Sequence, residues 1–220
     1  MKRGWLVVFE GLDGAGKSTQ LAGLAARLAG RGHDVVTTRE PYDCAAGRRI
    51  RAMARSGERV APEQELAWFL EQRRDHVREV IAPALAAGQV VLCDRYFLSS
   101  VAYQGARGLD PERILRESEA EFPLPDLVLL LEIEPGEGLA RARARPGPAE
   151  PSFEAADFLA RVAEAFRRLD RPYLERVNGS GPPEAVAQRV ETTLARRLPD
   201  LGYARRDAPS APPAPPREEP

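Results

Sequence analysis

The residues with the clearest chemistry form the segment GLDGAGKS, Gly11 to Ser18, which fits the pattern G-x-x-x-x-G-K-[ST]. Its glycines allow tight backbone conformations in which successive N–H groups point at anionic oxygens, and a following helix adds partial positive charge. The lysine of such a loop reaches the β- and γ-phosphates of a nucleotide, and the serine hydroxyl is a natural Mg²⁺ ligand. The segment predicts a phosphate-binding loop made of Gly11, Leu12, Asp13, Gly14, Ala15, Gly16, Lys17, Ser18 and Thr19.

Two aspartates could serve the same nucleotide. Asp94 directly follows the apolar run Val90 to Cys93, where proteins with this loop place a carboxylate near the nucleotide's Mg²⁺. We therefore expect Ser18 and Asp94 to be metal ligands. Asp13 lies inside the loop, where phosphates repel a carboxylate unless it binds a metal, water or a substrate hydroxyl. Asp13 thus indicates a role beyond holding phosphates.

Arginines could supply the charge that a transfer between two nucleotides needs. The base-reading Asn-Lys-x-Asp segment of GTPases is absent from the sequence. Phosphoryl transfer gathers a donor triphosphate and an acceptor phosphate in one site, where positive side chains offset the charge. Most arginines are solvated surface residues, so position must select among them. The candidates are Arg51, Arg73, Arg95, Arg141, Arg143 and Arg145.

Position favours a lid at about residues 141–153. Arg141 and Arg145 are four residues apart and can share a helix face, whereas Arg143 points away. Arg145 also precedes Pro146, where a helix tends to end. An arginine delivered by a closing lid stabilises transition-state charge, an effect of about 10³ to 10⁵ in rate. The alternative interpretation is a basic helix face in solvent.

Phe69 and Arg73 are also four residues apart, on a long helix expected over residues 63–80. Together they offer an aromatic plane and a planar hydrogen-bond donor on one side of that helix. Taken alone, Phe69 is typical of a core residue and Arg73 of a surface residue.

The elements that must position these residues alternate along the chain. Apolar runs predict strands over residues 5–9, 33–38, 90–93 and 126–133, and helical patterns lie between them. Helices are also expected over residues 154–175 and 185–197. This alternation predicts an α/β fold of three layers, a parallel sheet flanked by helices, with the loop, Arg39 and Asp94 at the carboxyl ends of the strands.

Composition limits the range of partners. The 220 residues are 43% hydrophobic and carry 32 Lys plus Arg against 33 Asp plus Glu, so polyanion binding is not the expected role. Cys44 and Cys93 lack metal-ligand spacing, and the longest apolar runs are too short to span a membrane. We expect a cytoplasmic protein that binds neither nucleic acid nor membrane. One domain should cover residues 1–203, followed by a disordered Pro/Ala-rich tail over residues 204–220.

Together, these pieces in this order resemble the thymidylate kinase family, with the bacterial type that carries a lid arginine. The similarity spans roughly residues 2–198 and rests on the following segments: FEGLDGAGKSTQ (9–20), TREP (38–41), FLEQR (69–73), DRY (94–96), SSVAYQG (99–105), PDL (125–127) and RARAR (141–145). Such a protein would have the P-loop nucleoside monophosphate kinase fold. It would move the γ-phosphate of ATP to dTMP with Mg²⁺, for dTTP synthesis, and would form homodimers.

The resemblance also implies roles for individual residues. Phe69 would stack on thymine, Asp13 would face the acceptor's sugar and phosphate, and Tyr103 would disfavour a 2′-hydroxyl. The catalytic residues would be Lys17, Arg95, Arg145 and Asp13, with Gly14 occupying the place of the P-loop arginine of another subclass. The acceptor would be bound by Arg39, Arg51, Phe69, Arg73, Arg95, Ser100, Tyr103 and Gln104.

Two departures from the family pattern leave alternatives open. Tyr42-Asp43-Cys44 replaces a usual Gly-Gly-Thr after the TREP segment, and Ser152 replaces a second lid arginine. One methyl group in an apolar pocket is worth about 1 to 3 kcal/mol, so thymine and uracil are not separated by these residues. The alternatives are a related kinase acting on dUMP or a deoxynucleoside, and a P-loop binding module that has lost catalysis.

Overall fold

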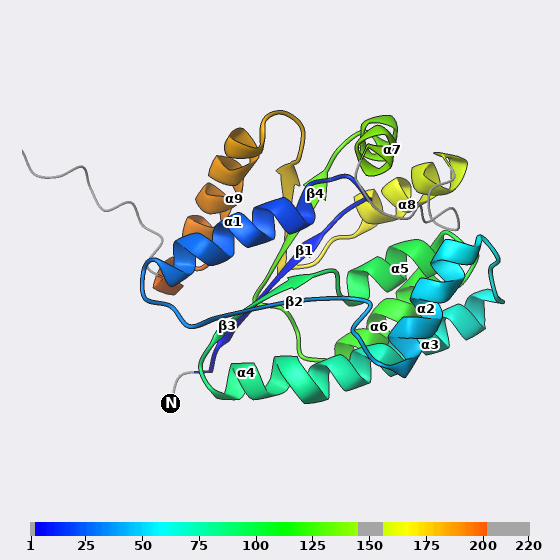
Figure 1. The fold of residues 1–220 in the computed structure, drawn as a ribbon, viewed down its shortest axis with the longest axis horizontal. Coiled ribbons are helices and arrows are strands. Elements are labelled where there is room, and N and C mark those ends of the chain that lie inside the picture. Colours follow the sequence, from blue (N-terminus) through cyan, green and yellow to red (C-terminus); the bar gives the residue numbers. More distant parts are fainter. Residues whose placement is uncertain (1–2, 145–155, 202–220) are drawn as a thin grey trace, which may run out of the picture.

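The computed structural model describes residues 3–144 and 156–201. Its centre is a parallel five-stranded sheet in the order β2-β3-β1-β4-β5 (Figure 1). The strands are β1 (Trp5–Glu10), β2 (Val35–Arg39), β3 (Val90–Asp94), β4 (Leu127–Glu132) and β5 (Leu174–Asn178). This arrangement confirms the predicted α/β fold class.

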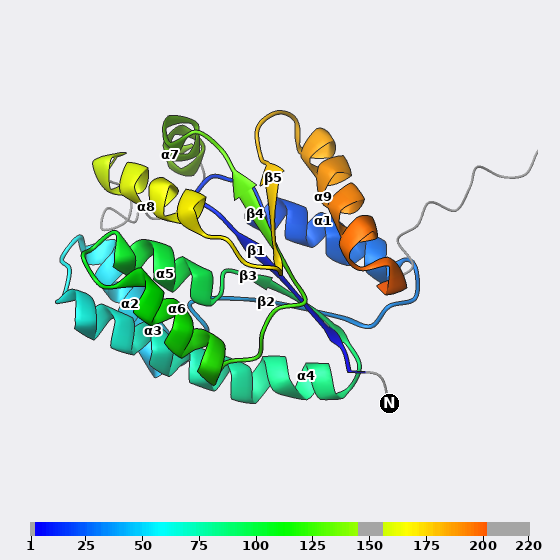
Figure 2. The ribbon, with the colours of Figure 1, turned by 180° about the vertical axis from the view of Figure 1, so that it is seen from behind.

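Helices cover both faces of the sheet, as the two opposite views show (Figures 1 and 2). One face is covered by α1 (Lys17–Ala29) and α9 (Pro183–Arg197), with a short 3₁₀ turn, η2 (Pro199–Leu201), after α9. On the other side lie α2 (Ala45–Ser56), α3 (Pro62–His76), the π-helical turn η1 (Val77–Ile81), α4 (Ala82–Ala86), α5 (Phe97–Gly105), α6 (Pro111–Glu121) and α8 (Ala156–Arg168). Helix α7 (Pro135–Arg143) lies beyond the end of β4, beside the loop that follows β1.

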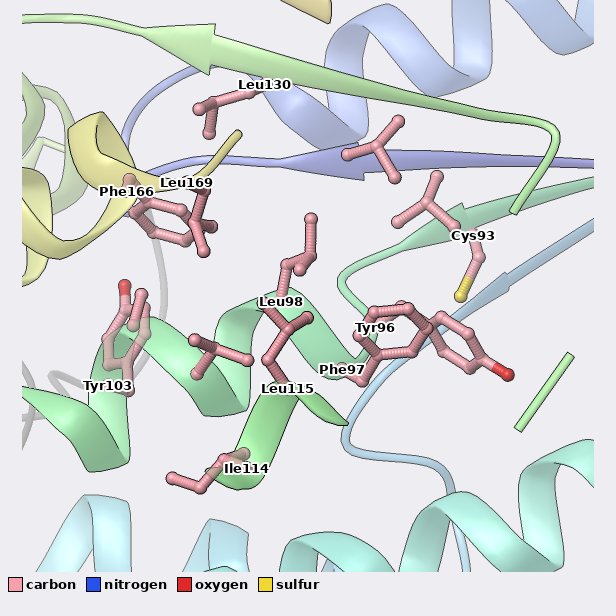
Figure 3. Close-up of a cluster of buried hydrophobic side chains, with 14 of the residues drawn as sticks. Cys93, Tyr96, Phe97, Leu98, Tyr103, Ile114, Leu115, Leu130, Phe166 and Leu169 are labelled. Atoms are coloured by element: carbon pink, nitrogen blue, oxygen red, sulfur yellow. The ribbon is translucent and has the colours of Figure 1, made fainter. Parts of the chain in front are cut away.

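Two apolar cores result from the alternation of side chains along the strands. Val7 and Phe9 of β1 pack in the core under α1 and α9, whereas Leu6 and Val8 pack in the other. The second core contains Tyr96, Phe97 and Leu98 together with residues of α6 and α8 (Figure 3). Strands buried on both faces explain the continuous apolar runs in the sequence.

The strand register gathers the chemical residues at one edge of the sheet. Phe9 of β1 and Arg39 of β2 are both register partners of Asp94 on β3. Because all strands are parallel, the loops that follow β1, β2 and β3 leave the sheet together at the carboxyl edge. The expected clustering of the glycine-rich loop, Arg39 and Asp94 at this edge is confirmed.

One secondary-structure prediction was wrong. The helix expected over residues 154–175 extends in the structure only to Arg168, and the chain then forms β5. β5 is an edge strand in which Val177 is the one fully buried side chain, so it lacks the apolar run that marked β3 and β4. The other predicted strands and helices agree with the structure to within a few residues at each end.

None of the helices within residues 3–144 and 156–201 is both long and apolar enough to cross a membrane. The predicted tail and most of the predicted lid lie outside the described residues, and so do Arg145 and Ser152.

Candidate active site

The lysine of the glycine-rich loop is buried, and its ammonium group contacts the backbone of the loop. Lys17 begins α1 and is only 6% exposed, and its Nζ donates to the carbonyl oxygens of Gly11 (3.1 Å) and Leu12 (2.8 Å). Burial, and secondarily the nearby Arg95 charge, lower the pKa of Lys17 to about 8. An ammonium group in a low-dielectric site interacts strongly with an incoming phosphate.

Ser18 and Asp94 meet at the edge of this loop, as the sequence predicted. The Ser18 hydroxyl donates to Oδ2 of Asp94 at 2.6 Å, while the buried Oδ1 of Asp94 has no hydrogen-bond partner among the described residues. Within the same residues, no group of three or more His, Cys, Asp and Glu side chains could hold a metal alone. One carboxylate and one hydroxyl suit Mg²⁺, which takes its remaining ligands from water and substrate phosphates.

Arg95 joins the glycine-rich loop to helix α5. Its Nη2 donates to Asp13 Oδ1 at 2.7 Å, and its Nη1 donates to the Gly11 carbonyl at 3.1 Å and to the Ser99 hydroxyl at 3.0 Å. The guanidinium also lies 5.2 Å from the centre of the Tyr103 ring. Arg95 adopts a positive φ of 72°, uncommon for a residue with a side chain. Such strain is maintained only where the surroundings fix it, and it is frequent at functional sites.

A narrow cavity of about 80 Å³ opens beside Arg95. It brings together predicted acceptor residues from α2, α3 and α5 that are far apart in the sequence. Phe69 of α3 and residues of α5 both line it, and Arg51 and Arg95 supply positive charge. The lining residues are Asp13, Pro41, Ile50, Arg51, Ala54, Phe69, Arg95, Ser99, Tyr103 and Gln104.

Arg73 and Ser100 lie behind this cavity rather than on its wall. Arg73 is 0% exposed, which contradicts the interpretation of this residue alone as a surface arginine. Its Nε and Nη2 donate to the Glu40 carboxylate at 2.5 to 3.1 Å, and Nη2 also donates to the Ser100 hydroxyl at 3.1 Å. Nη1 has no hydrogen-bond partner among the described residues. The buried Glu40 carboxylate is what allows an arginine at this depth.

Gln104 is held in the cavity wall by a second buried carboxylate. Its Nε2 donates to Glu65 Oε1 at 2.8 Å, and Glu65 also accepts from Arg59 and Arg107. The buried Oε1 of Gln104 has no hydrogen-bond partner among the described residues. The sequence indicated no role for Glu65, and Glu40 stood out only as part of the TREP segment (38–41). Their buried partners come from distant parts of the chain and could be known only from the packed structure.

A larger cavity of about 400 Å³ lies on the other side of the glycine-rich loop. Loop residues Gly14 to Thr19 line it together with Arg141 of α7 and the segment that precedes α9. Arg141 is held there by Glu137 at 2.5 Å and by the Gly179 carbonyl at 3.2 Å. The sequence did not point to this part of the chain, which contributes Gly179 and Gly181 before α9 and Pro183 and Val186 at the start of α9.

Known proteins are similar in sequence to this chain over most of its length. The model of the thymidylate kinase family matches residues 9–190. A thymidylate kinase of Desulfotalea psychrophila is 44% identical over 175 residues, which cover 80% of this chain and 86% of that protein. A thymidylate kinase of Akkermansia muciniphila is 42% identical over 200 residues, covering 91% of this chain and 96% of that protein. This chain belongs to the thymidylate kinase family.

Gly14 is the loop position at which another subclass of the thymidylate kinase family is expected to carry an arginine. Here Gly14 has a φ of 81°, and a Cβ atom would lie 2.1 Å from the carbonyl oxygen of Gly138 in α7. Any side chain would therefore require both backbone strain and displacement of α7. This packing fits a chain whose phosphate-facing arginine comes from elsewhere, as predicted for Arg145.

In the segment that departs from the thymidylate kinase pattern, Tyr42 and Cys44 make specific contacts, whereas Asp43 is exposed. The backbone N–H of Tyr42 donates to Gln72 Oε1 at 2.7 Å, and the Tyr42 ring stacks on His76 with 5.0 Å between centroids. Cys44 is the N-cap of α2, with its sulfur accepting from the Gly47 N–H at 3.5 Å. Arg39 ends β2 with an exposed side chain and does not line the two cavities described here.

Proposed function

We propose that the protein transfers the γ-phosphate of ATP to dTMP, giving dTDP and ADP, for dTTP synthesis. The observation that carries this proposal is the position of the glycine-rich loop between two cavities. Asp13 lines the narrow cavity and Gly14, the next residue, lines the large one. A donor phosphate held by the loop would thus lie beside an acceptor phosphate held by Arg51 and Arg95, as direct transfer requires.

On the acceptor side, the residues suit a pyrimidine nucleotide. Phe69 offers a stacking surface. Gln104 Oε1, which has no hydrogen-bond partner within residues 3–144 and 156–201, could accept a hydrogen bond from the ring N3–H of thymine or uracil. Cytosine carries an acceptor at ring position N3 in place of this N–H donor, so it could not make the same hydrogen bond. Asp13 and Tyr103 lie where a sugar hydroxyl could meet them, 3.3 Å from each other.

On the donor side, we assign the large cavity to ATP, with its phosphates on the loop amides and its base near Arg141 and the segment before α9. Ser18 and Asp94 would hold Mg²⁺, which supplies charge neutralisation to the phosphate oxygens. Lys17 and the arginines offset the charge that spreads over the transferred group. An oxygen of the dTMP phosphate attacks the γ-phosphorus, and the bond to the β-phosphate oxygen of the departing ADP breaks.

The test is acceptor-resolved phosphoryl transfer, measured as ADP release with ATP and each of dTMP, dUMP, dCMP and thymidine. We expect turnover with dTMP, a lower kcat/KM with dUMP, and little turnover with dCMP or thymidine. Failure with dTMP alongside turnover of dUMP or thymidine would identify a kinase with another acceptor. If the protein binds nucleotides but releases no ADP from ATP with any of these acceptors, it is a binding module.

Arg145 remains a prediction from the sequence. We expect Arg145→Ala to lower kcat at least a hundredfold with little change in dTMP affinity, because a lid arginine acts mainly in the transition state. Arg143→Ala is the matched control, since Arg143 is exposed at the end of α7. Single-turnover rates and equilibrium binding of dTMP separate the two effects. An equal loss of affinity and rate in Arg145→Ala would contradict this role.

Three further proposals concern the whole protein. We infer from the family that it forms a homodimer, and from composition that it acts in the cytoplasm and that residues 1–203 are one kinase domain followed by a disordered tail. Light scattering should give twice the mass of the chain. Removal of residues 204–220 should leave kcat/KM unchanged.

A further inference from the structure

Both arginines of the narrow cavity are paired with an aspartate. Arg95 contacts Asp13 at 2.7 Å, and Arg51 contacts Asp43 at 2.5 Å. The two pairs differ in their surroundings. The Asp13 side chain is 27% exposed and is also bonded to Tyr103, whereas the Asp43 side chain is 76% exposed. Asp43 can therefore turn into solvent without leaving a buried group unpaired, and Asp13 cannot.

Asp43 is not needed to hold Arg51 in place. The Nη1 atom of Arg51 already donates to the carbonyl oxygens of Pro41 at 3.0 Å and Tyr42 at 3.5 Å. The Tyr42 carbonyl comes this close to α2 because residue 47 is glycine, where a Cβ atom would lie 1.8 Å from it. Two backbone acceptors thus orient the guanidinium through Nη1, and Nη2 donates to Asp43 Oδ1.

We propose that Asp43 is an internal competitor for the acceptor phosphate, occupying the Arg51 guanidinium until the nucleotide displaces it. This inference rests on the proposed function, in which Arg51 binds that phosphate. A phosphate monoester carries a charge of about −1.5 to −2 at pH 7, so it outcompetes a single carboxylate for one guanidinium. The displaced carboxylate remains close and repels the bound phosphate.

Asp43 therefore lowers the affinity of the protein for both the acceptor and the product. Repulsion from Asp43 raises the Kd and KM of dTMP, and it also favours release of dTDP, whose phosphate next to the sugar occupies the same place. Because Asp43 is largely exposed, solvent screens the effect, which keeps it modest. Asp43 is thus a residue that tunes affinity rather than one that touches the reacting atoms.

The test compares wild type with Asp43→Asn and Asp43→Glu, with dTMP and thymidine as ligands in calorimetry and dTMP as substrate in steady-state assays. We expect Asp43→Asn to bind dTMP three- to tenfold more tightly, with a matching fall in KM and an equal or lower kcat. Thymidine affinity should not change, because thymidine has no phosphate. Asp43→Glu keeps the charge and should behave like wild type, and 0.5 M salt should remove most of the difference.

Glu71→Gln is the matched control. It removes the exposed carboxylate that pairs with Arg49, and Arg49 lies on α2 as Arg51 does. This variant should leave dTMP affinity unchanged. Weaker or unchanged dTMP binding in Asp43→Asn would overturn the proposal, as would equal tightening of thymidine or an equal effect of Glu71→Gln. Failure of wild type to turn over dTMP would contradict the proposed function instead, so the two failures are distinguishable.

Discussion

Lys17→Met is expected to lower kcat/KM by about 10³-fold while leaving the protein at least as stable as wild type. The rate falls because the buried ammonium is the cation built into the phosphate-binding loop, and such preorganised groups contribute about 10² to 10³ or more each. Lys17→Arg keeps the charge in a larger and planar shape that does not fit under the loop carbonyls. It should therefore remain severely impaired, which separates charge from geometry.

The stability of Lys17→Met follows from the lowered pKa of Lys17. In the folded protein this pKa is about 8, against a usual value of 10.5. Below pH 8 the folded state carries the full cost of a buried charge, so Lys17→Met gains up to roughly 3 kcal/mol there. Between pH 8 and 10.5 the unfolded chain holds the proton more tightly, and wild-type stability rises relative to the variant. Unfolding by urea at pH 7 and pH 10 measures this change.

The sequence makes the pKa directly measurable. Lys17 and Lys2 are the only lysines of the chain, so an NMR titration of labelled lysine side chains yields two signals. One should titrate near pH 8 and disappear in Lys17→Met. A variant that is strongly destabilised at pH 7, or a wild-type protein whose lysines both titrate near 10.5, would contradict the buried environment of Lys17.

The sequence predicted the parts of this protein that depend on local pattern. The glycine-rich loop has a fixed spacing, and β3 and β4 are continuous apolar runs because helices cover both faces of the sheet. Asp94 could be placed near Ser18 because parallel strands end at one edge. β5 could not be found in this way, since an edge strand with Glu175 and Arg176 has no such run. Pro172 was the available signal, because it disfavours helix at Arg171.

The pairings within the site were not predictable from pattern. In the sequence, Arg73 looks like a surface residue. In the structure, α3 packs near the end of β2, and Arg73 pairs with Glu40, which lies 33 residues earlier in the chain. Asp43 and Arg51 are eight residues apart, a spacing that suggests no contact on a helix. Arg141 is positioned by a hydrogen bond to the carbonyl oxygen of Gly179, which lies in a segment without a recognised motif. Such contacts depend on tertiary structure, which local spacing does not encode.

Glu40→Gln should destabilise the protein by about 3 to 5 kcal/mol at pH 7, because it leaves the Arg73 guanidinium buried without a counter-charge. The two side chains are 2% and 0% exposed, so solvent cannot replace the lost partner. Glu40 also accepts from His76 at 3.2 Å, and the backbone N–H of Glu40 donates to Asp94. The variant should therefore also raise the KM for dTMP, since Arg73 and Ser100 behind the cavity lose their support.

The pH dependence of this loss distinguishes an ionic role of Glu40 from one of packing. Burial alone would raise the pKa of Glu40, but the Arg73 charge and the contact with His76 outweigh it and hold the pKa below its usual 4.5. The folded state thus favours the ionised carboxyl of Glu40. The stabilisation by Glu40 is complete above the usual pKa of 4.5 and is lost as the pH falls through the lower pKa of the folded state. The difference in unfolding free energy between wild type and Glu40→Gln should be constant from pH 6 to 8 and shrink towards pH 3.

Two further variants complete this test. Glu117→Gln removes the exposed partner of Arg113 and should leave the unfolding free energy nearly unchanged at any pH. Glu40→Gln combined with Arg73→Met removes both charges and should be more stable than Glu40→Gln alone, because no unpaired charge remains buried. Urea unfolding of the four proteins across this pH range supplies the measurement. A double variant less stable than Glu40→Gln, or a difference that persists unchanged to pH 3, would mean that Glu40 acts by filling space rather than by neutralising Arg73.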